Sequence, residues 1–155
     1  MAGAAGLSIC ALSYAELDNE NRLYASAATL RLRQLGKERA DFGGDSTALH
    51  LIARRASDPN KPSAPAPAMG AALLQLDREG DAAIKQLAVA AEDAAERAAG
   101  AAALIARAVA EALGMGRLSL VAPAAAHAEE ARAWLRDAGF VERGPGGDLA
   151  CDLAR

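Results

Sequence analysis

The segment from Ile84 to Ala122 constrains the fold more than any other part of this sequence. It opens with an apolar strand, Ile84–Val89, and continues through a long stretch of helical composition, Glu92–Leu113. It ends in a second apolar strand, Leu118–Ala122, which stops at Pro123. Two strands joined by a helix pair in parallel through a right-handed crossover. The segment therefore predicts a mixed α/β sheet and excludes a helical bundle.

Further strands and helices are expected on both sides of this unit. Apolar runs predict strands at Leu7–Leu12, Thr47–Arg54, Met69–Leu76, Ala82–Val89, Phe140–Glu142 and Asp148–Leu153. A first helix is expected from the N-cap candidates Asp18 and Asn19 to Gly36, and a last helix over Ala128–Ala138. We expect a loop, or the opening turn of a helix, at Gly100, because glycine inside a helix costs about 1 kcal/mol relative to alanine.

Length and composition predict a single domain over residues 1–155. The chain is 52% hydrophobic and 24% charged, as expected for one globular core. Most of its prolines fall in residues 57–68, and proline lacks the amide donor that a sheet interior needs. We interpret this segment as a long hairpin connection, because too few residues precede it to form a separate core.

Hydrophobic patterning and net charge exclude several classes of partner. The sequence has no run of about 18 large apolar residues, so no membrane-spanning helix is expected. Its first residues carry no basic cluster ahead of an apolar run, so they do not resemble a signal peptide. A net charge of −3 gives no general attraction to nucleic acid. We therefore expect a cytoplasmic protein.

Cysteine and alanine usage bear on metal binding and stability. Cys10 and Cys151 lie at opposite ends of the chain without closely spaced ligands, which argues against a metal site and favours small buried strand residues. Alanine is abundant and aromatic residues make up 3%, so the core buries little apolar area per residue. We expect modest stability, which a partner subunit would increase.

Chemistry is most clearly indicated where the Ile84–Val89 strand leads into the following helix. The residues from Arg97 to Ala102 are small apart from the arginine itself. A strand, a small-residue loop and a helix N-terminus direct backbone N–H groups and the positive end of the helix dipole toward one point. This geometry is suited to binding a diphosphate.

At these residues the chain resembles the GCN5-related N-acetyltransferases. The signature of that family is Gln or Arg, two residues, Gly, one residue, then Gly or Ala, and Arg97, Gly100 and Ala102 fit it. The strand residues 85–89, which end in Ala-Val, resemble the strand before the family's pyrophosphate loop. Residues 131–140, which end in Gly-Phe, resemble the segment that contains its last helix. The resemblance extends from about Asp18 onward, and the order of elements agrees.

The resemblance implies a mixed, mostly antiparallel sheet with a split parallel pair and flanking helices. Acetyl-CoA would lie in the split and give its acetyl group to a primary amine of a small molecule or a peptide. A backbone amide near Val89 would stabilise the oxyanion. The implied cofactor-binding residues are Leu87, Ala88 and Val89 for pantetheine, and Arg97, Ala98, Ala99, Gly100, Ala101 and Ala102 for the diphosphate. A homodimer is also common in the family.

Several residues depart from the family pattern and leave alternatives open. The tyrosine that often protonates the leaving thiolate aligns with Leu135, so no catalytic residue is assigned. Glu92, Asp93 and Glu96 flank the loop, and a shift of one residue would make Ala99 and Ala101 its paired small positions. The alternatives to an enzyme are a degenerate binding or regulatory module of the same fold, and an alanine-rich interaction protein without a cofactor.

Aromatic and histidine side chains have simple structural interpretations beside functional ones. We interpret His50 as a strand residue with a satisfied ring, and His127 as a surface or capping residue. Trp134 is expected in the core or in a dimer contact. Tyr14 and Tyr24 would lie near the acceptor side of the family's cleft, where either could donate a proton.

Overall fold

The computed structural model describes residues 7–18, 21–36, 45–55, 68–78, 81–144 and 146–153. Its elements are β1 (Leu7–Ser13), α1 (Tyr14–Asp18), α2 (Asn21–Leu35), β2 (Leu49–Arg55), β3 (Ala68–Arg78), β4 (Asp81–Val89), α3 (Ala94–Gly114), β5 (Ser119–Ala122), η2 (Ala124–Ala126), α4 (Glu129–Asp137), β6 (Val141–Glu142) and β7 (Leu149–Asp152). Of the predicted proline-rich loop, only Ala68 falls within the described residues.

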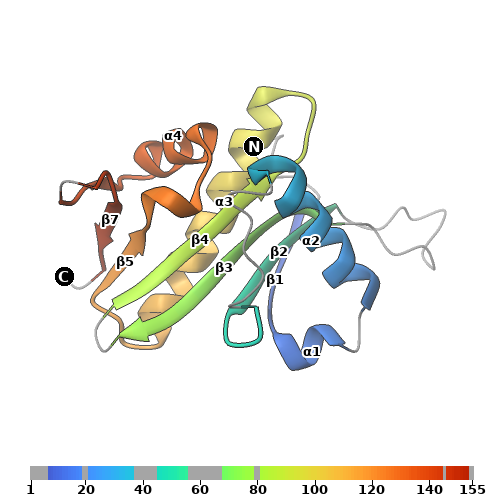
Figure 1. Cartoon of the computed structure of the whole chain (residues 1–155), viewed down its shortest axis with the longest axis horizontal. Coiled ribbons are helices and arrows are strands. Elements are labelled where there is room, and N and C mark those ends of the chain that lie inside the picture. Colours follow the sequence, from blue (N-terminus) through green and yellow to red (C-terminus); the bar gives the residue numbers. More distant parts are fainter. Residues whose placement is uncertain are drawn as a thin grey trace.

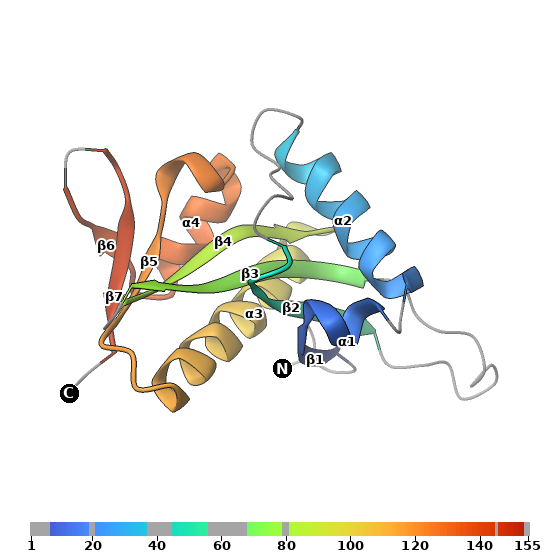
Figure 2. The same ribbon diagram turned by 60° about the horizontal axis from the view of Figure 1, so that its bottom comes forward.

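One seven-stranded sheet, in the order β1-β2-β3-β4-β5-β7-β6, carries helices on both faces. Helix α2 lies over β3 and β4 on one face, and α3 crosses the opposite face (Figures 1 and 2). The larger apolar cluster contains residues of α3, α4 and the sheet, and a smaller cluster joins α2 to the sheet. The sequence-based prediction of a mixed α/β sheet with flanking helices is confirmed.

Strands β4 and β5 form the parallel pair that the sequence predicts, but they pair only briefly. Their register runs from Asp81 opposite Ser119 to Ala83 opposite Val121, and no pairing follows between the later, described residues of these strands. Every other neighbouring pair in the sheet is antiparallel. The sheet therefore splits beyond Ala83, with β4 on one side of the gap and β5 on the other.

A β-bulge interrupts β4 just after this point. Ala71 of β3 faces Ala88 and Leu73 faces Lys85, so two residues of β4, Gln86 and Leu87, oppose a single residue of β3. Gln86 has a φ of 56°, a left-handed conformation that costs an ordinary residue about 1–3 kcal/mol. The extra residue reverses the alternation of side chains, as bulges do.

Helix α3 begins earlier than predicted and runs through Gly100 without interruption. The prediction of a loop at Gly100 was therefore wrong. A Cβ atom at this position would lie 3.1 Å from Cγ1 of Val89, so the glycine allows α3 to pack closely on β4. This tight packing outweighs the low helix propensity of glycine.

The N-terminal half agrees with its predicted elements, although the first helix is divided. A short α1 precedes α2, whose buried residues include Leu23, Ala27 and Leu30 at helical spacing. Gly36 follows α2 with a φ of 79°, and its N–H bonds the carbonyl of Leu32 at 2.9 Å, as predicted for a C-cap.

Candidate functional site

The split leaves one edge of β4 without a neighbouring strand. Ala90 donates its N–H to the carbonyl of Met69 in β3 at 2.8 Å. Because peptide groups alternate along a strand, those of Ala88 also face β3, and those of Leu87 and Val89 face the split. The side chains of Leu87 and Val89 are buried toward α3. This part of β4 therefore turns backbone groups rather than side chains toward the split, and both residues are buried.

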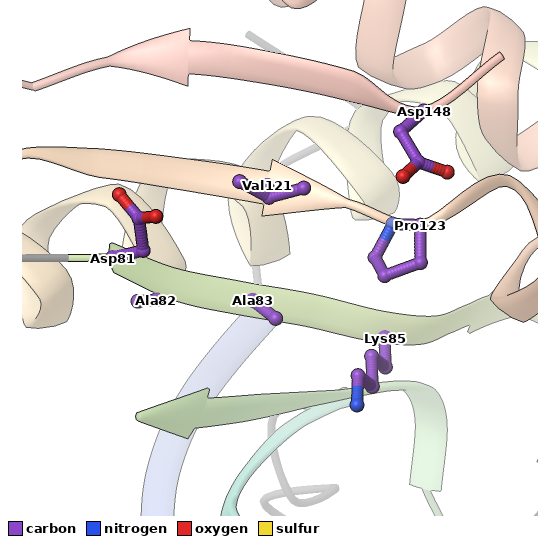
Figure 3. A pocket seen from close by; sticks show the side chains of 7 residues that line it. All are labelled: Asp81, Ala82, Ala83, Lys85, Val121, Pro123 and Asp148. Carbon is purple, nitrogen blue, oxygen red and sulfur yellow. The ribbon is translucent and has the colours of Figure 1, made fainter. Parts of the chain in front are cut away.

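A pocket of about 280 Å³ lies where β4 and β5 separate (Figure 3). At its closed end Ser119 donates a hydrogen bond of 2.5 Å to Asp81. Asp148, which precedes β7, accepts the N–H of Ala124 at 2.8 Å. Lys85 donates to the side chain of Gln75 at 2.6 Å. The pocket thus has two carboxylates on its walls and an amine that is held by β3.

The N-terminus of α3 lies directly after the unpaired end of β4. The N-cap residue is Asp93, and among the described residues its side chain makes no capping hydrogen bond. The first backbone hydrogen bond of this helical turn runs from the N–H of Arg97 to the carbonyl of Asp93, at 3.0 Å. The N–H groups of Ala94 and Ala95 come before the first turn is closed, so they are available to an anion.

The side chain of Arg97 ties this turn to α4. Its Nη1 donates to the carbonyls of Ala91 and Glu92, at 2.8 and 3.0 Å. Its Nε and Nη2 donate to the carboxylate of Glu130 in the first turn of α4, each at 3.1 Å. Both side chains are partly exposed. A guanidinium beside an open helix N-terminus gives this corner a second anion-binding group.

The other predicted diphosphate residues lie within α3 rather than in a loop. Gly100 and Ala101 are buried against the core. Ala98, Ala99 and Ala102 line a hollow of about 330 Å³ between α3 and α4, opposite Trp134, Asp137 and Ala138. Their amides belong to the helix interior, because the closed part of the helix begins at Arg97. The groups free to bind an anion therefore come before the predicted segment.

A buried polar network, which the sequence analysis missed, lies beneath the β4 bulge. Arg31 of α2 is 1% exposed and forms two hydrogen bonds of 2.9 Å with the carboxylate of Asp45. Its Nε and Nη2 also donate to Oε1 of Gln86, at 3.1 and 2.9 Å. Tyr24 donates to the same carboxylate at 2.5 Å. Burial and this hydrogen bond raise the pKa of Tyr24 to about 12.

The two histidines differ in how far they follow their predicted roles. His50 lies in β2 with its Nε2 donating to the carbonyl of Asp45 at 2.8 Å, so the prediction of a satisfied strand residue is confirmed. Burial lowers its pKa. His127 is 1% exposed, and the prediction of a surface residue was wrong. Its Nδ1 donates to the carbonyl of Pro123, and burial lowers its pKa to about 4.

The aromatic side chains that the structure describes lie in one small cluster or pack on the core. The rings of Tyr14, Tyr24 and His50 form a cluster with centroids 5.6–6.3 Å apart. Trp134 packs against the main apolar cluster, as predicted for a core residue. Leu135 aligns with the tyrosine that often protonates the leaving thiolate in the resembled family, and it is fully buried.

Potential metal ligands do not gather in the described ranges. Within them, no group of three or more His, Cys, Asp or Glu side chains is placed to hold a metal ion. None of the helices in these ranges combines the length and apolar character needed to cross a bilayer. Cys10 and Cys151 are partly buried free thiols in β1 and β7.

No protein-family model matches this sequence, and no curated protein does so either. Solved structures, in contrast, match it over nearly its whole length. GCN5 of Tetrahymena has a TM-score of 0.68 at 16% identity, covering 95% of this chain and 96% of its own. The IAA acetyltransferase of Bacillus cereus has a TM-score of 0.64 at 16% identity, covering 95% and 99%. YhbS, a GNAT family N-acetyltransferase of Escherichia coli in complex with CoA, has a TM-score of 0.63 at 15% identity, covering 96% and 82%.

These structures are similar to the chain in architecture at low sequence identity. The similarity agrees with the split parallel pair and with the motif resemblance at Arg97, Gly100 and Ala102. The chain therefore has the fold of the GCN5-related N-acetyltransferases.

Proposed function

We propose that this protein transfers an acetyl group from acetyl-CoA to a primary amine of a small molecule or a peptide. The observation that carries this proposal is the split between β4 and β5, with its unpaired backbone edge next to an open helix N-terminus. The similar E. coli structure, which was solved with CoA, supports the choice of cosubstrate.

The pantetheine arm would bind along the free edge of β4. The two amide groups of pantetheine are able to pair with the peptide groups of Leu87 and Val89, as an added strand would. Ala88 would contribute packing only, because its peptide groups face β3 and its side chain packs in the smaller apolar cluster. This arrangement places the thioester close to the bulge.

The diphosphate would bind at the first turn of α3. The N–H groups of Ala94 and Ala95, the helix dipole and the Arg97 guanidinium all favour an anion at this corner. Ala98, Ala99 and Ala102 would flank it without steric hindrance, since they line the hollow between α3 and α4. Gly100 and Ala101 would act through packing.

The chemistry would be a direct transfer. The amine nitrogen attacks the thioester carbonyl, a C–N bond forms, and the N–H of Leu87 or Val89 stabilises the oxyanion. The C–S bond then breaks, CoA leaves as a thiolate, and the proton released by the new amide nitrogen neutralises it. Leu135 donates no proton, so the proton that the thiolate takes up comes from the cationic nitrogen of the tetrahedral intermediate, which forms when the neutral amine attacks.

Isothermal titration of the protein with acetyl-CoA and with CoA tests the proposal. We expect one site with a dissociation constant in the micromolar range, corresponding to about −8 kcal/mol. Arg97→Ala weakens binding, whereas Arg107→Ala, which lies farther along α3 and pairs with Glu111, serves as the matched control. Absence of heat at millimolar ligand would overturn the proposal. Release of CoA thiol with a panel of amines then identifies the acceptor.

A second candidate function is that of a binding module that has lost catalysis. It is favoured by Leu135, which replaces a proton donor, and by the exposed carboxylates of Glu92 and Asp93 beside the α3 N-terminus. CoA binding without thiol release across the amine panel would support this function over the first.

A further inference from the structure

We propose that Arg31 is a positioning residue of the transfer site, because it holds the β4 bulge in place through Gln86. This inference rests on the proposed function and identifies which side chains outside the split control the chemistry within it.

The conformation of Gln86 needs external support. Its φ of 56° lies in the left-handed region of backbone conformation, which residues other than glycine rarely adopt. Strained backbone of this kind persists only where surrounding contacts determine it. The side chain of Gln86 is 4% exposed, and its oxygen accepts two hydrogen bonds from Arg31. These contacts join the bulge to α2.

Arg31 is itself fixed by an interaction with a third segment. Its guanidinium meets Asp45 in a two-bond arrangement with both distances at 2.9 Å, and both side chains are almost completely buried. Paired guanidinium and carboxylate planes restrict each other's orientation more strongly than a single bond does. Tyr24 in turn donates a hydrogen bond to the carboxylate of Asp45, and His50 donates one to its backbone carbonyl. The bulge therefore rests on a network with little freedom to move.

The position of the bulge determines what the split presents to a ligand. Gln86 lies immediately before Leu87, whose peptide groups face the split by the alternation counted back from Ala90. A change in the backbone angles of Gln86 would rotate that N–H away from a bound thioester. Catalysis by a fixed dipole depends on its direction before the reaction begins. Arg31 thus acts on the reaction from the opposite face of the sheet, without contact with the substrate.

The primary test uses Gln86→Leu, which removes the acceptor but leaves the ion pair of Arg31 with Asp45 intact. We expect kcat for thiol release from acetyl-CoA, with an acceptor amine found in the panel, to fall by at least about tenfold. KM for acetyl-CoA should stay within about threefold, since the diphosphate corner is unchanged. Gln86→Glu retains an acceptor for Arg31 and should recover most of the lost kcat. Arg33→Gln, on the exposed side of α2, is the matched control.

A second measurement does not depend on activity. Amide hydrogen exchange at Ala88 and Ala90, whose N–H groups face β3, should become at least about tenfold faster in Gln86→Leu, while the amides shared by β2 and β3 keep their rates. Normal kcat in Gln86→Leu, or a loss that Gln86→Glu does not reverse, would overturn the inference. If the wild type binds no acetyl-CoA, the proposed function fails, and the positioning role of Arg31 in the transfer fails with it. A difference in hydrogen exchange that persists in that case would show that Arg31 supports only the structure of the bulge.

Discussion

The Arg97 guanidinium and the Glu130 carboxylate connect α3 to α4 at the corner where we propose that a diphosphate binds. The carboxylate accepts two hydrogen bonds of 3.1 Å from the same guanidinium that would bind the ligand. An incoming diphosphate and Glu130 would therefore compete for Arg97.

The first prediction follows from this competition. Glu130→Gln removes a negative charge from the corner and should tighten CoA binding by about threefold to fivefold, in keeping with the small energies of partly exposed ion pairs. Titration calorimetry measures the change. Glu129→Gln, which removes the neighbouring exposed charge of the same helical turn, is the control, and an equal gain in both variants would mean that only net charge matters.

The second prediction concerns the buried pair of Arg31 and Asp45. Arg31→Met leaves a buried carboxylate without its partner and should lower the free energy of unfolding by about 3–5 kcal/mol. The double variant Arg31→Met/Asp45→Leu removes both charges and should lose less than Arg31→Met alone. Urea unfolding measures each value. Additive losses in the double variant would contradict the prediction.

The third prediction compares two glycines of α3. A Cβ at Gly114 meets nothing within 4 Å, so Gly114→Ala should raise the unfolding free energy by about 0.5–1 kcal/mol through helix propensity. At Gly100 the new methyl would press against buried Val89, and overpacking should give a net loss of about 1 kcal/mol. Stabilisation by both substitutions in urea unfolding would show that α3 does not need this close approach. For the same reason, loss of CoA binding in Gly100→Glu would report disrupted packing of α3 on Val89 rather than a lost contact with the diphosphate.

The fourth prediction uses the low pKa of His127. The unfolded chain binds a proton at this residue near pH 6.5, whereas the folded chain does so only near pH 4, so acid favours unfolding in between. Between pH 7.5 and pH 5 this residue should remove about 2 kcal/mol of stability. His127→Leu should show a weaker pH dependence by that amount. Equal pH dependence in both proteins, measured by urea unfolding, would mean that the folded state accepts the proton.

Much of the fold could be predicted because local patterns and connection rules agree along this chain. The apolar strands before and after the long helix predict parallel pairing, and β4 and β5 pair in that way. The separation of the strands could not be predicted from these runs alone. Pro123 marks the end of the second strand, but the apolar residues Ile84, Leu87 and Val89 give no sign that β4 continues without a partner. The separation of the strands depends on tertiary packing, to which strand periodicity is insensitive.

The candidate site was predicted less completely, for two physical reasons. Apolar residues of β4 change phase between Ile84 and Leu87, which is the signal of a bulge, but a buried strand with apolar residues on both faces obscures it. Arg31 lies four residues after Ala27 on the buried side of α2, and this position alone would have indicated a buried cation. Its partner Asp45 comes from a distant turn, and no local spacing reveals such a pair.

The split has a consequence for how the chain behaves without a ligand. An unpaired strand normally lies at the border of a sheet, where short length, charge or a covering helix prevents association with another chain. Here the unpaired edge lies between the fourth and fifth strands of seven, and Leu87 and Val89 are buried. Its place inside the sheet therefore keeps this uncharged edge from pairing with a strand of another molecule, a protection that border strands must obtain in other ways.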